Sequence, residues 1–203
     1  MSWMNMVCDG ENLFSPRGYG SIIEDGFQYV PVQFNTQVSG INTKDDVVVI
    51  ETSNGPIQTK KCICTVSMGV LNGHQIKFTP ELPPWKRRAF NDMQMGHLLK
   101  VHLELHDTHG FPDDTWIYEH HEHYNYFFYH VRPAGCPWVV AYLGGDHAKE
   151  VGKKDKETLA TLLQTPLVKR YQCLAKETFG ETFFKDWSSQ PHILGSYASH
   201  RPG

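Results

Sequence analysis

One lysine lies in a stretch of strict apolar and polar alternation, HLLKVHLEL, at residues 97–105. A period of two is typical of a strand with one buried face, and it places Lys100 on the same face as His102 and Glu104. The opposite face carries only aliphatic side chains: Leu99, Val101, Leu103 and Leu105. An ammonium on a strand can hold a water molecule and oppose negative charge that develops nearby. The alternation alone nevertheless favours a lysine in solvent over a catalytic one, because sheets commonly keep one face in water.

Histidines form the second group of candidate residues. Seven lie between residues 102 and 130: His102, His106, His109, His120, His121, His123 and His130. The run HHEH at 120–123 lacks the His-Glu-x-x-His spacing of a helical zinc site, and on a strand adjacent histidines point to opposite faces. Cys62 and Cys64 share a strand face, which favours packing in a core over metal binding. We therefore expect neutral or solvated histidines and no metal, with a metal-binding β-domain as one alternative hypothesis.

The first third of the chain predicts short strands. Gly26–Phe34 and Val38–Ile41 alternate between apolar and polar side chains and are bounded by turn formers. Asp45–Val66 predicts a hairpin, because Asn54-Gly55 supplies the positive φ angles of a tight turn. Gly18-Tyr19-Gly20 follows no convincing strand and is interpreted as a loop.

The rest of the chain predicts an α+β fold with a mostly antiparallel sheet flanked by helices. Pro83 and Pro84 favour a helix over Trp85–Gln94, before the alternating strand at 97–105. Three runs of aromatic and β-branched residues predict further strands of the same sheet: 115–120, 124–131 and 137–145. Apolar residues three and four apart predict two helices, at 156–163 and 167–179, with Pro166 between them. The tail 183–197 predicts a short strand followed by an irregular loop.

The composition is that of a globular protein and gives no sign of a nucleic-acid partner or a membrane span. The 203 residues are 40% hydrophobic, and the net charge of -3 contains no block of one sign. No apolar run reaches the roughly 20 residues that a spanning helix needs. Five scattered cysteines predict free buried thiols in a reducing compartment, and hence an intracellular, cytoplasmic protein: Cys8, Cys62, Cys64, Cys136 and Cys173. The sequence does not indicate an oligomeric state.

Two longer segments resemble one family. Thr65–Leu105 has a Thr-Val, then Gly-Val-Leu, Ile-x-Phe-x-Pro-x-Leu-Pro, a helix, a glycine and a Lys-Val strand. Lys185–Gly203 has a tryptophan, then Gly-Ser-Tyr and Pro-Gly. In order and spacing both are similar to flavin-containing amine oxidases of the polyamine oxidase and lysine-specific histone demethylase type. A weaker similarity covers QVSGI, before the hairpin. Gln190 departs from the family pattern, which usually has aspartate there.

The resemblance implies roles for four residues. Lys100 corresponds to the lysine that holds a water against the reactive nitrogen of the flavin. Val38 corresponds to a position whose backbone meets the adenine part of FAD. Trp187 and Tyr197 correspond to aromatic residues near the isoalloxazine and the amine, tasks that suit aromatic faces. Ordinary core packing is the alternative interpretation of both rings.

The family also implies a domain division and a reaction. Residues 1–70 would form part of an FAD-binding domain, 71–184 a substrate-binding domain, and 185–203 the start of a C-terminal FAD-binding segment. The family's Gly-x-Gly-x-x-Gly turn and its final flavin motif are missing, so we expect a central fragment, truncated at both ends, that does not bind FAD stably by itself. The full-length parent would oxidise a C–N bond of a polyamine or other small amine by hydride transfer to FAD, with hydrogen peroxide produced. A non-catalytic remnant or interaction module is the other alternative.

Overall fold

The computed structural model describes residue 15 and residues 17–200, and the chain divides into two compact units with the boundary between Asn35 and Thr36. The described part of the first unit contains one helix, α1 (Tyr19–Phe27), which begins directly after Gly18. The predicted strand over Gly26–Phe34 is therefore wrong, as is the predicted loop at Gly18–Gly20. Alternation reports on the faces of a strand, but a strand also needs a neighbour for its backbone hydrogen bonds. The described residues of this unit offer none.

The second unit begins with a four-stranded sheet in the order β3-β2-β1-β4. Its strands are β1 (Val38–Asn42), β2 (Val48–Thr52), β3 (Ile57–Thr59) and β4 (Lys77–Thr79). The predicted strand at 38–41 and the predicted hairpin are confirmed, with Gly55 at a φ of 103° in the turn. The hairpin's second strand ends earlier than predicted, at Thr59. Cys62 and Cys64 therefore lie outside any strand and are exposed, so their predicted packing in a core is wrong.

This small sheet extends past residue 70, because β4 pairs in parallel with β1. A small core beneath it consists of Ile41, Val70 and Ile76. Two helices follow, α2 (Met68–Asn72) and α3 (Pro84–Asn91). The helix predicted over Trp85–Gln94 exists, but it ends at Asn91 because the chain enters β5 (Met93–Gly96), which pairs with β11 (Tyr197–His200).

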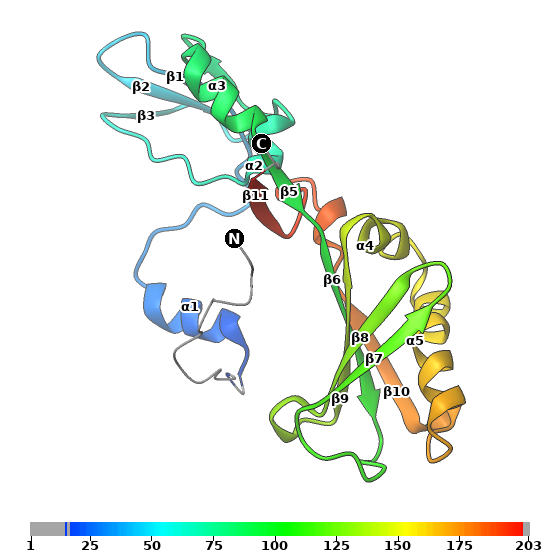
Figure 1. The fold of residues 1–203 in the computed structure, drawn as a ribbon. Coiled ribbons are helices and arrows are strands. Elements are labelled where there is room, and N and C mark those ends of the chain that lie inside the picture. The colour runs from blue at the N-terminus through cyan, green and yellow to red at the C-terminus, as the bar shows by residue number, and fades with distance from the viewer. Residues whose placement is uncertain (1–14, 16, 201–203) are drawn as a thin grey trace, which may run out of the picture. The chain divides into compact units, whose positions relative to one another are not determined.

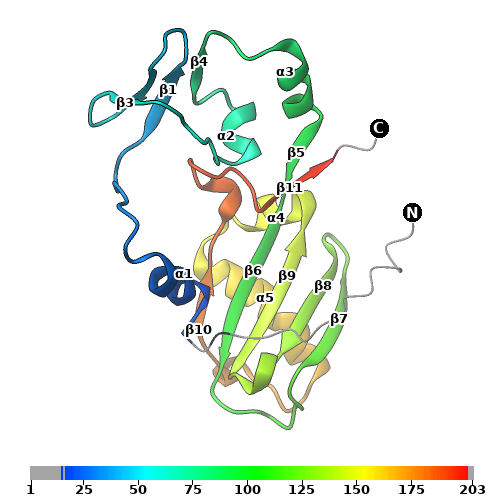
Figure 2. The ribbon, with the colours of Figure 1, turned by 90° about the vertical axis from the view of Figure 1, so that its left-hand side faces the viewer.

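The main body is a five-stranded, fully antiparallel sheet in the order β10-β6-β9-β8-β7. Its strands are β6 (Leu98–Leu105), β7 (Thr115–His121), β8 (Asn125–Val131), β9 (Trp138–Gly144) and β10 (Phe179–Phe184). The prediction of one antiparallel sheet is confirmed. Leu99, Val101, Leu103 and Leu105 are all buried, as the alternation predicts. Helices α4 (Gly145–Val151) and α5 (Lys156–Arg170) pack on this apolar face (Figures 1 and 2).

Helix α5 is continuous, so the prediction of two helices separated by Pro166 is wrong. A proline inside a helix costs about 3 kcal/mol or more. Leu159, Leu163 and Leu167 lie on one side of α5 and are at most 1% exposed. Burial of each leucine contributes about 1.5–3 kcal/mol, so three of them outweigh the proline. Beyond Arg170 only a 3₁₀ turn, Lys176–Thr178, precedes β10.

Two further expectations concern thiols and membranes. The four cysteines that the structure describes, at 62, 64, 136 and 173, are free but exposed, so the predicted burial is wrong for them; Cys8 lies outside the described residues. None of the helices in the described part of the chain is both long and apolar enough to span a bilayer.

Candidate functional site

Lys100 lies near the start of β6, on the face of the five-stranded sheet opposite α5, which we call the outer face. Its side chain is exposed, and its register partner on β9 is Tyr142. The Lys100 Nζ lies 5.3 Å from the centre of the Tyr142 ring. Within the described residues Lys100 forms no ion pair. The ammonium is therefore held against an aromatic surface without a carboxylate to neutralise it.

Aromatic rings dominate the outer face around Lys100. Those that are exposed by 40–59% are Trp116, Tyr118, Tyr126, Phe128 and Phe183. The Trp116 ring lies 5.7 Å from that of Tyr142 and stacks on that of His130 at 4.2 Å, with 11° between the planes. Burial raises the pKa of Tyr142, so its phenol stays protonated near neutral pH. Such a face can hold an alkyl chain, a flat ring or an ammonium group.

His102 follows Lys100 on the same face. Burial lowers the pKa of His102, and the charge of Lys100 lowers it further, against the opposing effect of a hydrogen bond with the Phe183 backbone. A neutral imidazole beside Lys100 leaves the ammonium as the cation at this end of β6.

Trp187 and Tyr197 lie in a segment that returns to the junction of β5 and β6. The Ser196 hydroxyl accepts a hydrogen bond from the Leu98 N–H and donates one to the Leu98 carbonyl, both at 2.9 Å. The His97 Nδ1 and the Ser188 Oγ lie 2.6 Å apart. Burial is the largest cause that lowers the pKa of His97. The segment is thus fastened to residues two and three positions before Lys100.

Both predicted aromatic residues are partly exposed at this junction. Trp187 is in a 3₁₀ turn, and its carbonyl accepts a hydrogen bond from the Gly195 N–H at 3.1 Å. Tyr197 pairs with Gly96, and its ring lies so close over Gly96 that a Cβ there would be within 3 Å of it. Their exposures are 43% for Trp187 and 53% for Tyr197, so neither is an ordinary core residue.

Val38 lies apart from these three residues, in the small sheet. It is half-buried in β1 and pairs with Thr52 of β2. The small sheet's helix α2 approaches the returning segment, because the Ser67 hydroxyl donates to the Ile193 carbonyl at 2.5 Å. Gly69 permits this approach, since a Cβ there would lie 2.6 Å from the same carbonyl. Trp187 and Tyr197 therefore belong to a segment fastened just before Lys100 in the chain, whereas Val38 belongs to a different sheet.

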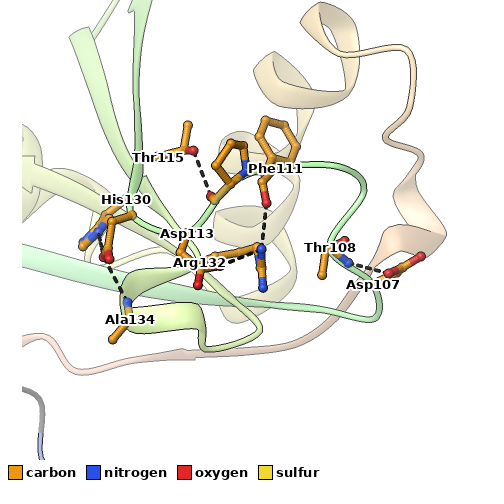
Figure 3. A network of polar contacts seen from close by, with 10 residues as sticks. Asp107, Thr108, Phe111, Asp113, Thr115, His130, Arg132 and Ala134 are labelled. Atoms are coloured by element: carbon orange, nitrogen blue, oxygen red, sulfur yellow. Dashed lines mark hydrogen bonds and ion pairs between the residues drawn. The ribbon is translucent and has the colours of Figure 1, made fainter.

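A polar network lies where β7 begins and β8 ends (Figure 3). This network is not evident from the sequence. The His130 Nε2 and the Asp114 Oδ1 lie 2.9 Å apart, and the Ala134 N–H donates to the same oxygen at 2.9 Å. Arg132 forms an ion pair with Asp113 at 2.7 Å. The hydrogen bond from Ala134, followed by that from His130, lowers the pKa of Asp114. The network holds the ring of His130, on which Trp116 stacks. Only the β7–β8 register, in which Trp116 and His130 are partners, could have indicated that these residues lie together.

Neither the histidines nor the cavity beside α3 contains the residues predicted for the expected chemistry. Among the described residues, no three His, Cys, Asp or Glu side chains are arranged as metal ligands. A cavity of about 870 Å³ lies between α2, β4 and α3, with Phe78 and Phe90 in its wall and Arg88 among its basic residues. None of the four predicted site residues lines it.

The residues of this chain suit one part of a flavin cofactor, its flat ring system. The ammonium of Lys100 and the exposed rings at the β5–β6 junction suit a flat ring that gains negative charge on reduction. The pyrophosphate would need a glycine-rich turn between a strand and a helix, and the 203 residues contain no Gly-x-Gly-x-x-Gly.

Comparisons with known proteins agree with the resemblance seen in the sequence. A family model described as flavin containing amine oxidoreductase matches residues 2–203. Polyamine oxidase 4 of Oryza sativa subsp. japonica is 30% identical over 196 residues, which cover 95% of this chain and 40% of that protein. Lysine-specific histone demethylase 1 homolog 2 of Arabidopsis thaliana is 27% identical over 205 residues, covering 96% and 27%.

The fold agrees as well. A solved structure of wild-type putrescine oxidase bound to putrescine matches with a TM-score of 0.69 at 17% identity, covering 89% of this chain and 40% of that one. This chain spans 40% or less of the length of these three proteins. The family match over almost the whole sequence is decisive, and the chain belongs to the flavin-containing amine oxidoreductase family.

Proposed function

We propose that this chain provides the substrate-binding sheet and part of the flavin site of an FAD-dependent amine oxidase. The substrate is a polyamine or another small alkylamine, whose C–N bond is oxidised to an imine that water then hydrolyses. The observation that carries the proposal is the Lys100 ammonium on the aromatic outer face, which forms no ion pair within residues 17–200 and follows the residues that fasten the segment bearing Trp187 and Tyr197.

The residues of this chain would prepare that reaction in three ways. Exposed rings would hold the alkyl part of the amine and exclude water from it. Lys100 would fix one water molecule at its ammonium and oppose negative charge that develops on the oxidant. Trp187 and Tyr197 would border the isoalloxazine and the amine, and the Val38 backbone would meet the adenine. FAD, when bound, accepts the hydride from the amine carbon and passes the electrons to oxygen, which gives hydrogen peroxide.

The test is flavin reduction in the natural polypeptide with FAD bound, with and without Lys100→Met. We expect anaerobic mixing with a polyamine to bleach the flavin absorbance, and the variant to bleach it far more slowly. Lys60→Met removes an exposed lysine outside the site and is the matched control. Equal rates in all three proteins would remove Lys100 from the mechanism.

A non-catalytic interaction module is the second candidate function, should the natural polypeptide lack the glycine-rich turn that these 203 residues do not contain. The purified chain distinguishes the two functions when FAD is added and the excess removed. A stoichiometric yellow complex that polyamines bleach would exclude the non-catalytic module. A colourless chain, with no flavin bound by the natural polypeptide, would favour it.

A further inference from the structure

A notch lies at the edge of the outer face. It has a volume of about 230 Å³ and is lined by Tyr124, Tyr126, Phe128, Leu143, Gly144 and His147, which we call the aromatic notch. It lies where β8 begins and β9 ends, the same end of the sheet at which β6 begins. Tyr126 and Phe128 are exposed by 54% and 40%, so their rings are accessible.

Strand register fixes the position of the notch relative to Lys100. Tyr142 of β9 is the partner of both Lys100 on β6 and Phe128 on β8. Directly paired residues project on the same face of a sheet. Phe128 is thus two strands away from Lys100 on the outer face, a backbone separation of about 10 Å. One extended ligand can reach both places.

The charge around the notch is suited to a cation. The Tyr124 hydroxyl donates to the Glu150 carboxylate at 3.0 Å, and the His123 Nε2 lies 3.4 Å from the same oxygen. The hydrogen bond from Tyr124, and then that from His123, lowers the pKa of Glu150, so this carboxylate is ionised near neutral pH. Asp146 precedes His147 on α4 and is 95% exposed.

The lysines nearby act on the carboxylates and do not line the notch, and the charge of Lys154 helps to lower the pKa of Glu150. Lys149 lies 3.4 Å from Asp146 along α4 and is directed to that carboxylate. The notch itself is walled by three aromatic rings and an imidazole, without a lysine or arginine. Aromatic faces beside a carboxylate are the combination that binds alkylammonium groups, whereas a neutral alkyl group would gain nothing from the charge.

We propose that the aromatic notch binds the distal ammonium of a linear polyamine whose reacting amine lies near Lys100. The inference rests on the proposed function and adds a specificity to it. An extended triamine spans the distance from Lys100 to the notch, and a short diamine does not. The notch would therefore favour triamines over diamines of the same kind.

Direct binding to the chain tests the notch without flavin chemistry. We would titrate the purified chain with spermidine, with putrescine and with a neutral diol of spermidine's length, and follow binding by calorimetry. Tyr126→Leu and Phe128→Leu keep apolar bulk but remove a ring face. Because a cation over an exposed ring contributes modestly, each variant should weaken spermidine binding about two- to tenfold and leave putrescine binding unchanged.

Trp85→Leu is the matched control, because Trp85 is an exposed ring on α3, outside the five-stranded sheet. It should bind spermidine as the original chain does, and circular dichroism should show that all variants are folded. Unchanged spermidine affinity in both notch variants would overturn the proposal, as would equal binding of the neutral diol. Loss of polyamine turnover in Lys100→Met bears on the proposed function instead, so the two ideas fail in different experiments.

Discussion

The ammonium of Lys100 lies 5.3 Å from the centre of the Tyr142 ring, across the β6–β9 pair. The two residues face each other in register, so the position of the lysine is set by backbone pairing and by one neighbouring ring. The absence of an ion pair among the described residues leaves the charge available to a ligand. This arrangement distinguishes Lys100 from a surface lysine that is held by a carboxylate.

The contact between Lys100 and Tyr142 should be measurable as a coupling energy. We expect a double-mutant cycle of Lys100→Met and Tyr142→Leu, followed by urea unfolding, to give about 0.5–1 kcal/mol, as for a cation over a partly exposed ring. Tyr142→Phe retains the ring and should retain most of the coupling. A coupling energy of zero would show that the Tyr142 ring does not hold the Lys100 ammonium.

Gly96 should tolerate no side chain while Tyr197 remains over it. Gly96→Ala places a Cβ within 3 Å of the ring, and we expect it to lower the free energy of unfolding by about 1–3 kcal/mol, as overpacking does. Gly144→Ala is the control, because nothing lies within 4 Å of its added Cβ. The cost should largely vanish when Gly96→Ala is combined with Tyr197→Ala. Equal melting temperatures for Gly96→Ala and Gly144→Ala would contradict the observed placement of the ring.

The Asp114 network predicts a specific dependence of stability on acid. The pKa of Asp114 is lower in the folded chain than the unfolded value of about 3.9. Its contribution is therefore fully present above that unfolded pKa and is lost as the pH falls through the lower, folded pKa. Asp114→Asn should reduce the melting temperature at neutral pH, and the difference from the original chain should shrink under acid conditions. If the difference in melting temperature stays constant as the pH falls through the folded pKa of Asp114, the charge of this carboxylate contributes nothing to stability.

The five-stranded sheet could be predicted because its strands carry a two-residue pattern with a buried side. In β6 the pattern identified the buried leucines and the exposed Lys100 without error. The same pattern misled at Gly26–Phe34, where the described first unit has no neighbouring strand, and at Cys62 and Cys64, which follow the end of β3. Local alternation gives the faces of a strand, and tertiary contacts decide whether the strand forms.

The candidate site was predictable only in part for a similar reason. Lys100 and Tyr197 were both candidates because of the family resemblance, since the alternation around Lys100 alone favours a lysine in solvent. Tyr142 and the aromatic notch arise from strand register, which brings together residues about 40 and 30 positions away from Lys100 in the chain. The two hydrogen bonds between Ser196 and Leu98 join segments 98 residues apart, and no periodicity connects them.

The most direct measurement is the rate of anaerobic flavin reduction by spermidine in the natural polypeptide with FAD bound. Lys100→Met should reduce that rate by about 10²–10³-fold, the scale of losing one hydrogen-bond donor directed at developing charge, while Lys60→Met leaves it unchanged. The flavin spectrum before mixing should be the same in all three proteins. If Lys100→Met reduces its flavin as fast as the original protein does, Lys100 is not a catalytic residue and the account of this site is wrong.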